Sequence, residues 1–268
     1  MKHSLSLNHR PRRGFSLIEL LVVISIIGIL AGLLLPTLAS AQKKAKVGKA
    51  KYEMSMIAGA INQYYATYNR FPTYTDAVKA AFANANSPND FTYGTFGAVL
   101  FPQQALSIVN RASHEANNSE VIAILRDNTN LVVNGPTYRY NPDKDHRANP
   151  NKHVFLNAQD VSATQLPGVG PDGVYRDPWK NPYIISLDLN GDNQCMDAFY
   201  RLNAVSVDLT DPAKVRGLNG LYRLDPKYQN NYVARVNVMV WSLGPDGRAD
   251  PNVNANAGAN KDNILSWK

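Results

Sequence analysis

From Phe15 to Leu38 the chain reads FSLIELLVVISIIGILAGLLLPTL, and this stretch decides the fold. Its 24 residues are almost all apolar, and Glu19 carries the only formal charge among them. As a helix the stretch would be about 36 Å long, which is enough to cross a hydrocarbon core of about 30 Å. Basic residues precede it, and such residues stay on the cytoplasmic side of a membrane. The sequence therefore predicts a single-pass span with the C-terminal bulk on the opposite side.

Three kinds of N-terminal segment share this pattern: an ordinary membrane anchor, a secretory signal peptide, and a short leader that is cut off before the span. The small residues Ala39-Ser40-Ala41 resemble a signal-peptidase site at the end of the apolar run. The apolar region of a signal peptide is usually about 7–15 residues long, which is shorter than this one. A signal peptide would leave Gln42 as the mature N-terminus, whereas an ordinary anchor would leave the chain unprocessed.

The residues around the start of the span favour the short leader. The segment Arg12-Arg13-Gly14-Phe15-Ser16-Leu17-Ile18-Glu19 closely resembles the prepilin-peptidase site of type IV pilins and of type II secretion pseudopilins. This resemblance implies cleavage by prepilin peptidase after Gly14 and N-methylation of the new terminus, Phe15. It also implies assembly roles for Glu19, which has the family's offset from that terminus, and for Pro36, because many members have a proline in the first helix.

Glu19 has a physical reason to act in assembly. A carboxylate at the edge of a membrane span is costly and usually indicates function, although an acid in the first helical turn is also favoured by the helix dipole. We hypothesise that Glu19 of one subunit pairs with the Phe15 amine of its neighbour in a filament. Pro36 lacks an N–H, so we expect it to kink or locally melt the helix.

After Pro36 the sequence becomes polar but remains helical in pattern. Apolar residues recur at spacings of three and four, which predicts one buried stripe on an amphipathic helix; they are Val47, Ala50, Met54, Ile57, Ile61, Tyr64 and Tyr68. Five lysines between 43 and 51 are interpreted as a solvated face that also suits contact with anionic lipid before assembly. We expect the helix to end near Asn69, before Pro72.

The rest of the chain predicts an α+β head, in which the amphipathic half of the helix packs on a small antiparallel β-sheet. Helices are expected at 73–83, 97–112 and 118–127, strands at 182–188, 197–204 and 235–242, and irregular chain at 84–95 and 134–173, with Tyr138 and Tyr140 on a short strand. The predicted segments are a leader (1–14), a transmembrane and filament-core helix (15–38), its amphipathic continuation (39–68) and a periplasmic head (69–268) with an enlarged insertion at about 84–170.

Composition excludes several function classes. The formal charge is +7, but residues 1–14 contribute four of these charges and contain no acid, so their removal leaves about +3 and no nucleic-acid partner is expected. Cys195 is the single cysteine, which rules out an intrachain disulfide. The sequence contains no H-E-x-x-H, G-x-S-x-G or phosphate-binding glycine loop. Asp143 and Asp145 are interpreted as solvating a loop, and we expect no enzymatic activity.

Two blocks near the C-terminus narrow the resemblance. The first runs from Asp177 to Tyr183, and the second contains Trp241–Gly247 followed by Asp262-Asn263-Ile264 and Trp267. Together they resemble the major (G-type) pseudopilin of type II secretion, with Lys180 in place of a usual glycine. The resemblance implies a calcium site built from the carboxylates of Asp246 and Asp262, the amide of Asn263 where the family usually has an aspartate, and the carbonyls of Leu243 and Arg248. Oxygen ligands suit Ca²⁺.

A second, weaker metal candidate is the loop that contains Asp188, Asn190 and Asp192. Its D-x-N-x-D spacing matches the start of a calcium loop, but the twelfth position is Phe199 and not an acid. Short runs of Asp, Asn and Gly more often form hairpin turns, and both interpretations stay open at this point.

Three functions are compatible with these patterns. The first is a structural pseudopilin in the inner membrane, with its N-terminus cytoplasmic and its head periplasmic. It would form a helical homopolymer with minor pseudopilins on an inner-membrane assembly platform. The second is a type IV pilin of a surface fibre for adhesion, motility or DNA uptake. The third is a membrane-anchored periplasmic binding protein or enzyme. The two C-terminal blocks favour the first.

Overall fold

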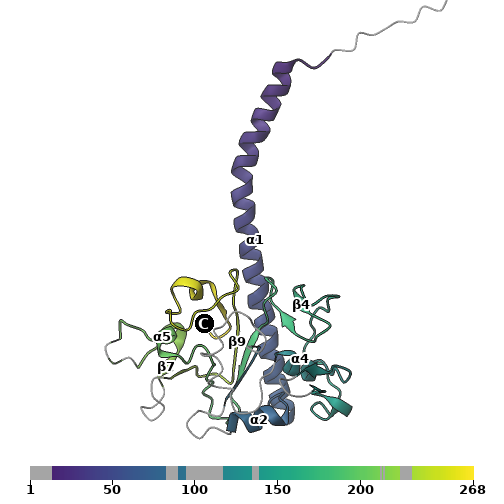
Figure 1. Ribbon diagram of the computed structural model, residues 1–268, viewed down its shortest axis with the longest axis vertical. Helices are drawn as coiled ribbons and strands as arrows, with labels where there is room; N and C mark the ends of the chain where they lie inside the picture. Colours follow the sequence, from purple (N-terminus) through teal and green to yellow (C-terminus); the bar gives the residue numbers. More distant parts are fainter. Residues whose placement is uncertain are drawn as a thin grey trace, which may run out of the picture. The chain divides into compact units, whose positions relative to one another are not determined.

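A computed structural model describes residues 14–82, 90–94, 117–134, 139–211, 213, 215–223 and 231–268. The chain divides into two compact units, Met1–Ala45 and Lys46–Lys268, which are described separately. Helix α1, Leu17–Tyr68, contributes to both (Figure 1). The N-terminal apolar helix and the small antiparallel sheet confirm the predicted α+β class.

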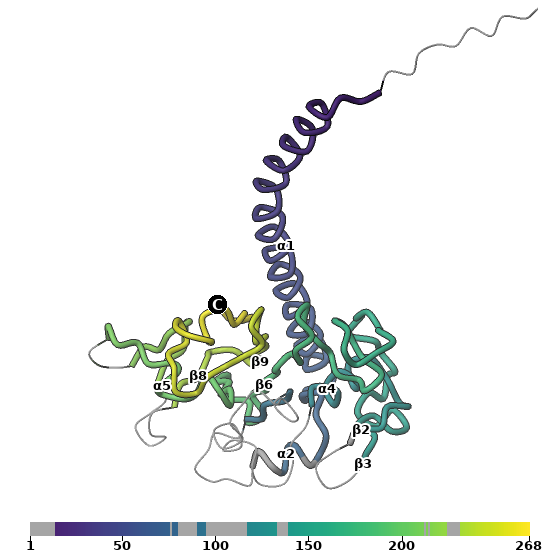
Figure 2. The backbone as a smooth tube through the Cα atoms, turned by 45° about the horizontal axis from the view of Figure 1, so that its top comes forward, coloured from purple at the N-terminus to yellow at the C-terminus, as the bar shows by residue number. Residues whose placement is uncertain are grey.

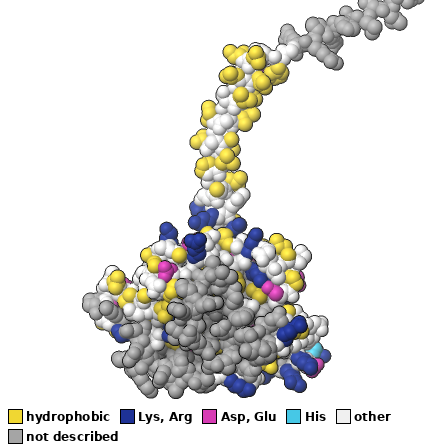
Figure 3. Space-filling view, viewed as in Figure 1, with side chains coloured by type: hydrophobic (Ala, Val, Ile, Leu, Met, Phe, Trp, Pro, Cys, Tyr) yellow, Lys and Arg dark blue, Asp and Glu magenta, His cyan; other side chains and the backbone are white. Residues whose placement is uncertain are grey.

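In the first unit, helix α1 leaves its apolar side chains exposed. Leu17 is 86% and Ile29 65% exposed, and hydrophobic side chains cover the visible face of this part of the helix (Figure 3). The helix is long and apolar enough to span a bilayer. Pro36 lies within this helix without interrupting it, so of the predicted kink or local melting the structure contradicts the melting only.

In the second unit, α1 packs through the predicted stripe. Its buried residues are Ala50, Glu53, Met54, Ile57, Ala60, Ile61 and Tyr64, with Val47 and Tyr68 partly buried beside them. These side chains share a core with Ile185 and Leu187 of the sheet. The helix ends at Tyr68, and Asn69 adopts a left-handed conformation with φ of 52°, as is common for a residue that terminates a helix. The predicted stripe and helix end are confirmed.

The sheet has four antiparallel strands in the order β1-β6-β9-β10. They are β1 (Phe91–Tyr93), β6 (Ile184–Leu187), β9 (Val238–Ser242) and β10 (Ile264–Leu265), and Figure 2 shows β6 beside β9. Alternate side chains point to opposite faces. Ile185 and Val240 therefore join the core under α1, whereas Ile184 and Trp241 join a second core with Phe199 and Tyr200.

Short elements complete the second unit. The helices are α2 (Thr75–Phe82), α4 (Ser119–Leu125), α5 (Asn203–Ser206) and the 3₁₀ turns η1 (Lys144–His146), η2 (Leu218–Gly220) and η4 (Gly258–Asp262). Within the described ranges, three two-stranded ribbons pair β2 (Val133–Asn134) with β3 (Arg139–Tyr140), β4 (Gly168–Val169) with β5 (Tyr175–Arg176), and β7 (Tyr222–Arg223) with β8 (Tyr232–Val233). Helix α4 packs into the same core as α1.

Most predicted elements of the head are confirmed, and two are wrong. Helices α2 and α4, strands β6 and β9, and Tyr140 on β3 lie where the sequence predicts them. The predicted helix 97–112 and Tyr138 lie outside the described residues. Strand β1 replaces part of the expected loop 84–95 because it pairs with β6, a partner far along the chain.

The predicted strand 197–204 is instead a turn followed by α5. The carboxylate of Asp197 accepts hydrogen bonds from the backbone N–H groups of Phe199 and Tyr200, at 2.9 and 2.8 Å. These bonds hold the backbone in a turn, and both aromatic rings enter the second core from it. The local side-chain acceptor therefore outweighs the β-propensity of the aromatic residues.

Candidate functional site

The N-terminal site begins with an exposed, non-helical Gly14-Phe15 pair, and Phe15 is 82% exposed. Helix α1 starts two residues later, at Leu17. The backbone N–H of Ser16 donates a 2.9 Å hydrogen bond to Glu19 Oε2. Ser16 and Glu19 thus have the spacing of a capping box, in which the acid three residues into the helix satisfies an N–H that the helix leaves unpaired.

The two C-terminal blocks meet at Asp177. This side chain is fully buried, and its Oδ2 accepts a 2.5 Å hydrogen bond from the Ser242 hydroxyl. Its Oδ1 accepts the backbone N–H groups of Trp179 and Asn181, at 2.8 and 2.9 Å. Burial outweighs these hydrogen bonds and raises the pKa of Asp177 to about 6. The turn 177–181 is thereby fixed to the end of β9.

Lys180 lies in this turn with φ of 79°. L-residues with a Cβ adopt such a conformation at a cost, and glycine adopts it freely. The backbone of this turn therefore explains why a glycine is expected at the position that Lys180 occupies.

The first block also reaches α1. Tyr183 donates a 2.6 Å hydrogen bond to Glu53 Oε2, across 130 residues of sequence. Burial raises the pKa of Tyr183 well above its ordinary value, and the neighbouring Glu53 carboxylate adds to the rise. The hydroxyl therefore stays protonated and donates to Glu53. This bond joins the chain just before β6 to helix α1.

The residues proposed for calcium lie on two segments that touch. Gly244 has φ of 69°, and a Cβ there would lie 2.1 Å from the carbonyl oxygen of Asp262. Only a glycine allows the chain after Leu243 to lie against Asp262 in this way. Among the described residues, Asp262 Oδ1 and Asn263 Oδ1 are buried without a hydrogen-bond partner. Two unsatisfied oxygens on adjacent residues fit the requirement of an oxygen-seeking cation.

The other proposed ligands are arranged less directly. Asp246 is exposed, and its Oδ1 accepts the backbone N–H of Arg248 at 2.9 Å. Asn263 donates through Nδ2 to the Tyr200 hydroxyl at 3.0 Å, which orients the amide oxygen. The calcium site thus remains a prediction, supported by the two unpaired oxygens.

The weaker metal candidate forms a turn that binds its own backbone. Asp188 accepts the N–H groups of Gly191 and Asn193, at 2.9 and 2.8 Å, through its two carboxylate oxygens. Asn190 accepts the N–H of Asp192 at 3.0 Å. The Asn190 bond is that of an Asx turn, and the Asp188 carboxylate is satisfied within the same loop, which favours the turn interpretation. Metal binding at Asp188, Asn190 and Asp192 stays an untested prediction.

Sequence reasoning missed two buried polar centres. Glu120 on α4 is fully buried and accepts hydrogen bonds from the hydroxyls of Tyr93, at 2.6 Å, and Tyr140. Asp143 is also fully buried, so the interpretation that it solvates a loop is wrong, although Asp145 is exposed. Asp143 lies within reach of Asp127 and His146. No local pattern predicts the Glu120 centre, because its partners Tyr93 and Tyr140 are 27 and 20 residues away.

Comparison with known protein families identifies the class of the N-terminal segment. Residues 9–35 match the family described as the prokaryotic N-terminal methylation motif. The chain therefore carries the N-terminal segment of proteins with this motif, at the position of the predicted leader and span.

The particular relatives are proteins named type II secretion system core protein G. The one from Pectobacterium carotovorum is 38% identical over 69 residues, which cover 26% of this chain and 44% of the relative. Those from Klebsiella michiganensis and Pseudomonas aeruginosa are 31% and 36% identical over 87 and 74 residues, covering 32% and 28% of this chain and 61% and 52% of theirs. The chain thus spans about half the length of these relatives. No solved structure matches it significantly. The predicted resemblance to type IV pilin-like proteins and to the G-type pseudopilin is confirmed.

Proposed function

We propose that the chain is a structural subunit of a type II secretion pseudopilus, processed by prepilin peptidase and polymerised through its N-terminal helix. The observation that carries this proposal is the methylation motif at residues 9–35 directly preceding and entering a helix whose apolar side chains are exposed. The proposal requires no catalytic residue. Cleavage after Gly14 would release residues 1–14 and leave a free amine at Phe15, which a separate methyl-transfer step would then methylate.

The exposed apolar helix serves two environments in turn. In the membrane, lipid covers its side chains and the subunit is anchored by one span. In a filament, the same surfaces pack against helices of other copies, and small residues such as Gly28 and Gly32 allow close approach. Beyond the helix's own backbone, no atom would lie within 4 Å of a Cβ added at either glycine. One surface thus supports anchoring before assembly and subunit packing afterwards.

Glu19 supplies the charge that this apolar packing needs. A methylated Phe15 amine at the helix N-terminus would lie near the positive end of the helix dipole, which is unfavourable without a counter-charge. A carboxylate has several acceptor positions, so Glu19 can keep its bond to the Ser16 N–H and still pair with the Phe15 amine of a neighbouring subunit. That pairing would offset two desolvated charges and set the axial register of the filament.

The head would lie in the periplasm and contact minor pseudopilins there. The inner-membrane assembly platform would bind the N-terminal helix. Calcium bound by Asp246, Asp262, Asn263 and the carbonyls of Leu243 and Arg248 would hold the two C-terminal segments together. The unpaired oxygens of Asp262 and Asn263 support this part of the proposal. No nucleic acid is involved.

Mass spectrometry of the mature N-terminus tests the proposal. The full chain is expressed with and without prepilin peptidase, and the N-terminal peptide is sequenced. We expect N-methylated Phe15 only when the peptidase is present. A mature chain beginning at Gln42 would indicate a signal peptide, and an intact N-terminus in the presence of the peptidase would indicate a plain anchor. Either result would contradict the proposal.

A further inference from the structure

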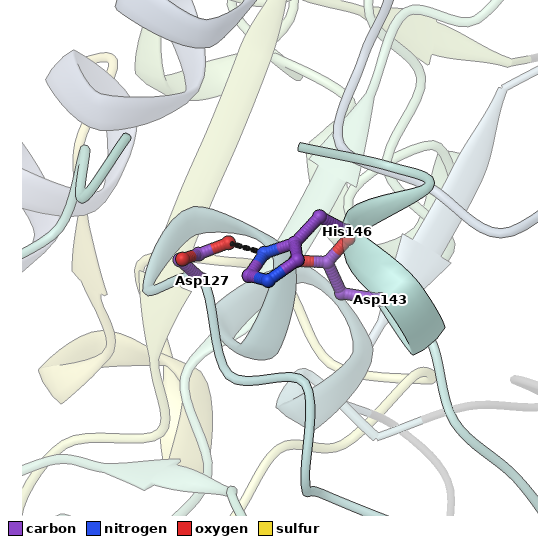
Figure 4. A group of neighbouring side chains, drawn as sticks. All are labelled: Asp127, Asp143 and His146. Carbon is purple, nitrogen blue, oxygen red and sulfur yellow. Dashed lines mark hydrogen bonds and ion pairs between the residues drawn. The ribbon is translucent and has the colours of Figure 1, made fainter. Parts of the chain in front are cut away.

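Three side chains of types that commonly bind metals lie close together at the end of α4. Asp127 follows that helix in a left-handed conformation, with φ of 55°, and Asp143 and His146 come from the turn around η1. One ligand atom from each lies within 4.8 Å of the others. Figure 4 shows the Asp127 and Asp143 carboxyl groups on either side of the His146 imidazole. The His146 Nδ1 to Asp127 Oδ1 distance is 2.7 Å.

The environment of the Asp143 carboxylate is not explained by an ion pair between Asp127 and His146. Its Oδ1 accepts the backbone N–H groups of Ala148 and Asn149, at 3.0 and 3.1 Å. Its Oδ2 is buried and has no hydrogen-bond partner among the described residues, and the whole side chain is 0% exposed. A buried, unsatisfied carboxylate oxygen is costly. A cation between this oxygen and the other two side chains would remove that cost.

The donor set indicates the class of cation. One imidazole nitrogen with two carboxylate oxygens suits a first-row divalent ion such as Zn²⁺, whereas Ca²⁺ prefers six to eight oxygens. The site is also accessible, because the side chains of His146 and Asp127 are 29% and 16% exposed. His146 also lines an open hollow together with Asn141 and Lys144, so its imidazole is reached from solvent.

We propose that Asp127, Asp143 and His146 form a zinc site that fixes the loop around η1 to the end of α4. The residues that follow the loop hold α1: Tyr64 donates a 2.5 Å hydrogen bond to the Ala148 carbonyl, and Tyr68 donates a 2.7 Å bond to Asn149 Oδ1. Zinc therefore stabilises the part of the insertion that packs on the helix. This role does not depend on the proposed assembly function.

Zinc titration of the full chain in detergent micelles tests the site. Excess Ca²⁺ is present throughout, so that Zn²⁺ binding to the C-terminal oxygen ligands does not contribute to the signal. We expect about one equivalent of Zn²⁺ bound by the wild type, a rise in its melting temperature, and affinity weakened at least about tenfold in Asp143→Asn and His146→Ala. Asp143→Asn retains an oxygen for Ala148 and Asn149, and His146→Ala alters a side chain outside the core.

The matched control is Asp145→Asn, which makes the same chemical change two residues away at an exposed position. It should bind zinc as the wild type does. Binding of Co²⁺ gives a second readout, because a site with nitrogen and oxygen ligands should produce a visible absorption band that both site variants lose. The site would be disproved if the wild type bound no zinc, or if the site variants bound it as tightly as Asp145→Asn.

Discussion

Asp177 accepts a 2.5 Å hydrogen bond from the hydroxyl of Ser242, and the two residues are 65 positions apart in sequence. The bond joins the turn after β5 to the last residue of β9, and Ser242 Oγ in turn accepts the Gly244 N–H at 3.0 Å. A buried carboxylate therefore organises both C-terminal blocks. The chain before Gly244 leads directly into the segment that touches Asp262, so this bond also supports the candidate calcium site.

Asp177 should make stability depend on pH. Its pKa is about 6 in the folded protein, above the ordinary value of 3.8. Well below pH 4 both states carry the proton. As the pH rises from about 4 to 6 the unfolded state loses its proton first, so stability falls, and it stays lower above pH 6. We expect the free energy of unfolding of the wild type, relative to Asp177→Asn, to fall by about 2 kcal/mol between pH 4 and pH 7.

Denaturant unfolding of the full chain in micelles, at pH 4 and pH 7 with a chelator present, measures that difference. Asp145→Asn serves as the control, because Asp145 is exposed and lies outside the buried turn. Its pH profile should follow that of the wild type. Parallel profiles for the wild type and Asp177→Asn would show that Asp177 does not carry the predicted penalty.

Lys180→Gly should stabilise the head. The left-handed φ of 79° costs a lysine about 1–2 kcal/mol. Glycine avoids this cost, but it loses more backbone entropy on folding, which offsets part of the gain. The expected net gain is about 0.5–1 kcal/mol in the free energy of unfolding. Lys51→Gly, an exposed change in the middle of α1, is the control and should instead lose about 1 kcal/mol. Equal effects from the two variants would refute the conformational explanation.

Local patterns were sufficient to predict the helical part of this fold. The apolar run and the stripe from Val47 to Tyr68 repeat within a few residues, so they determine α1 without knowledge of the rest of the chain. Strand β1 was missed because its pairing is nonlocal: Thr92 lies opposite Ser186, and their hydroxyls are 2.8 Å apart. The turn at Asp197 rests on local bonds to Phe199 and Tyr200, but the acid that makes them is buried and also accepts a bond from Trp241 Nε1, 44 residues away.

The candidate sites divide in the same way. Gly14, Phe15 and Glu19 form one continuous motif, and the sequence alone locates them. The cluster of Asp127, Asp143 and His146 depends on two successive left-handed residues, Asp145 and His146, that turn the imidazole back toward α4. No spacing rule predicts that reversal, so this cluster became visible only in three dimensions.

Glu19→Ala and Glu19→Gln should separate the two tasks of this carboxylate. Glutamine keeps an oxygen for the Ser16 N–H and therefore the helix cap, but it removes the charge. We expect both variants to be inserted and cleaved, and both to fail to form filaments that can be sedimented and seen by electron microscopy. Filaments from Glu19→Gln at wild-type levels would show that the charge is dispensable and that the cap is what matters.

Removal of calcium should destabilise the wild-type head. We expect 1 mM Ca²⁺ to raise the melting temperature of the full chain in micelles. If this concentration is a hundred times the dissociation constant, the free energy of unfolding should rise by about 3 kcal/mol. Asp262→Asn should lose most of this effect, because it removes the carboxylate that has a buried, unpaired oxygen. Asp208→Asn, which changes an acid on a separate loop, is the control. A calcium response that Asp262→Asn leaves unchanged would exclude this site.

Asn263→Asp should strengthen calcium binding. The neutral amide presents a buried oxygen without a partner, and an aspartate would place a negative charge at the same position. Without calcium the variant should be less stable than the wild type, because it loses the 3.0 Å bond from Nδ2 to the Tyr200 hydroxyl and adds a charge near Asp262. With calcium the order should reverse, and the affinity measured by titration should rise roughly tenfold, because affinity follows the number of ligand charges. A variant that is destabilised to the same extent with and without calcium would mean that the Asn263 oxygen does not face the ion.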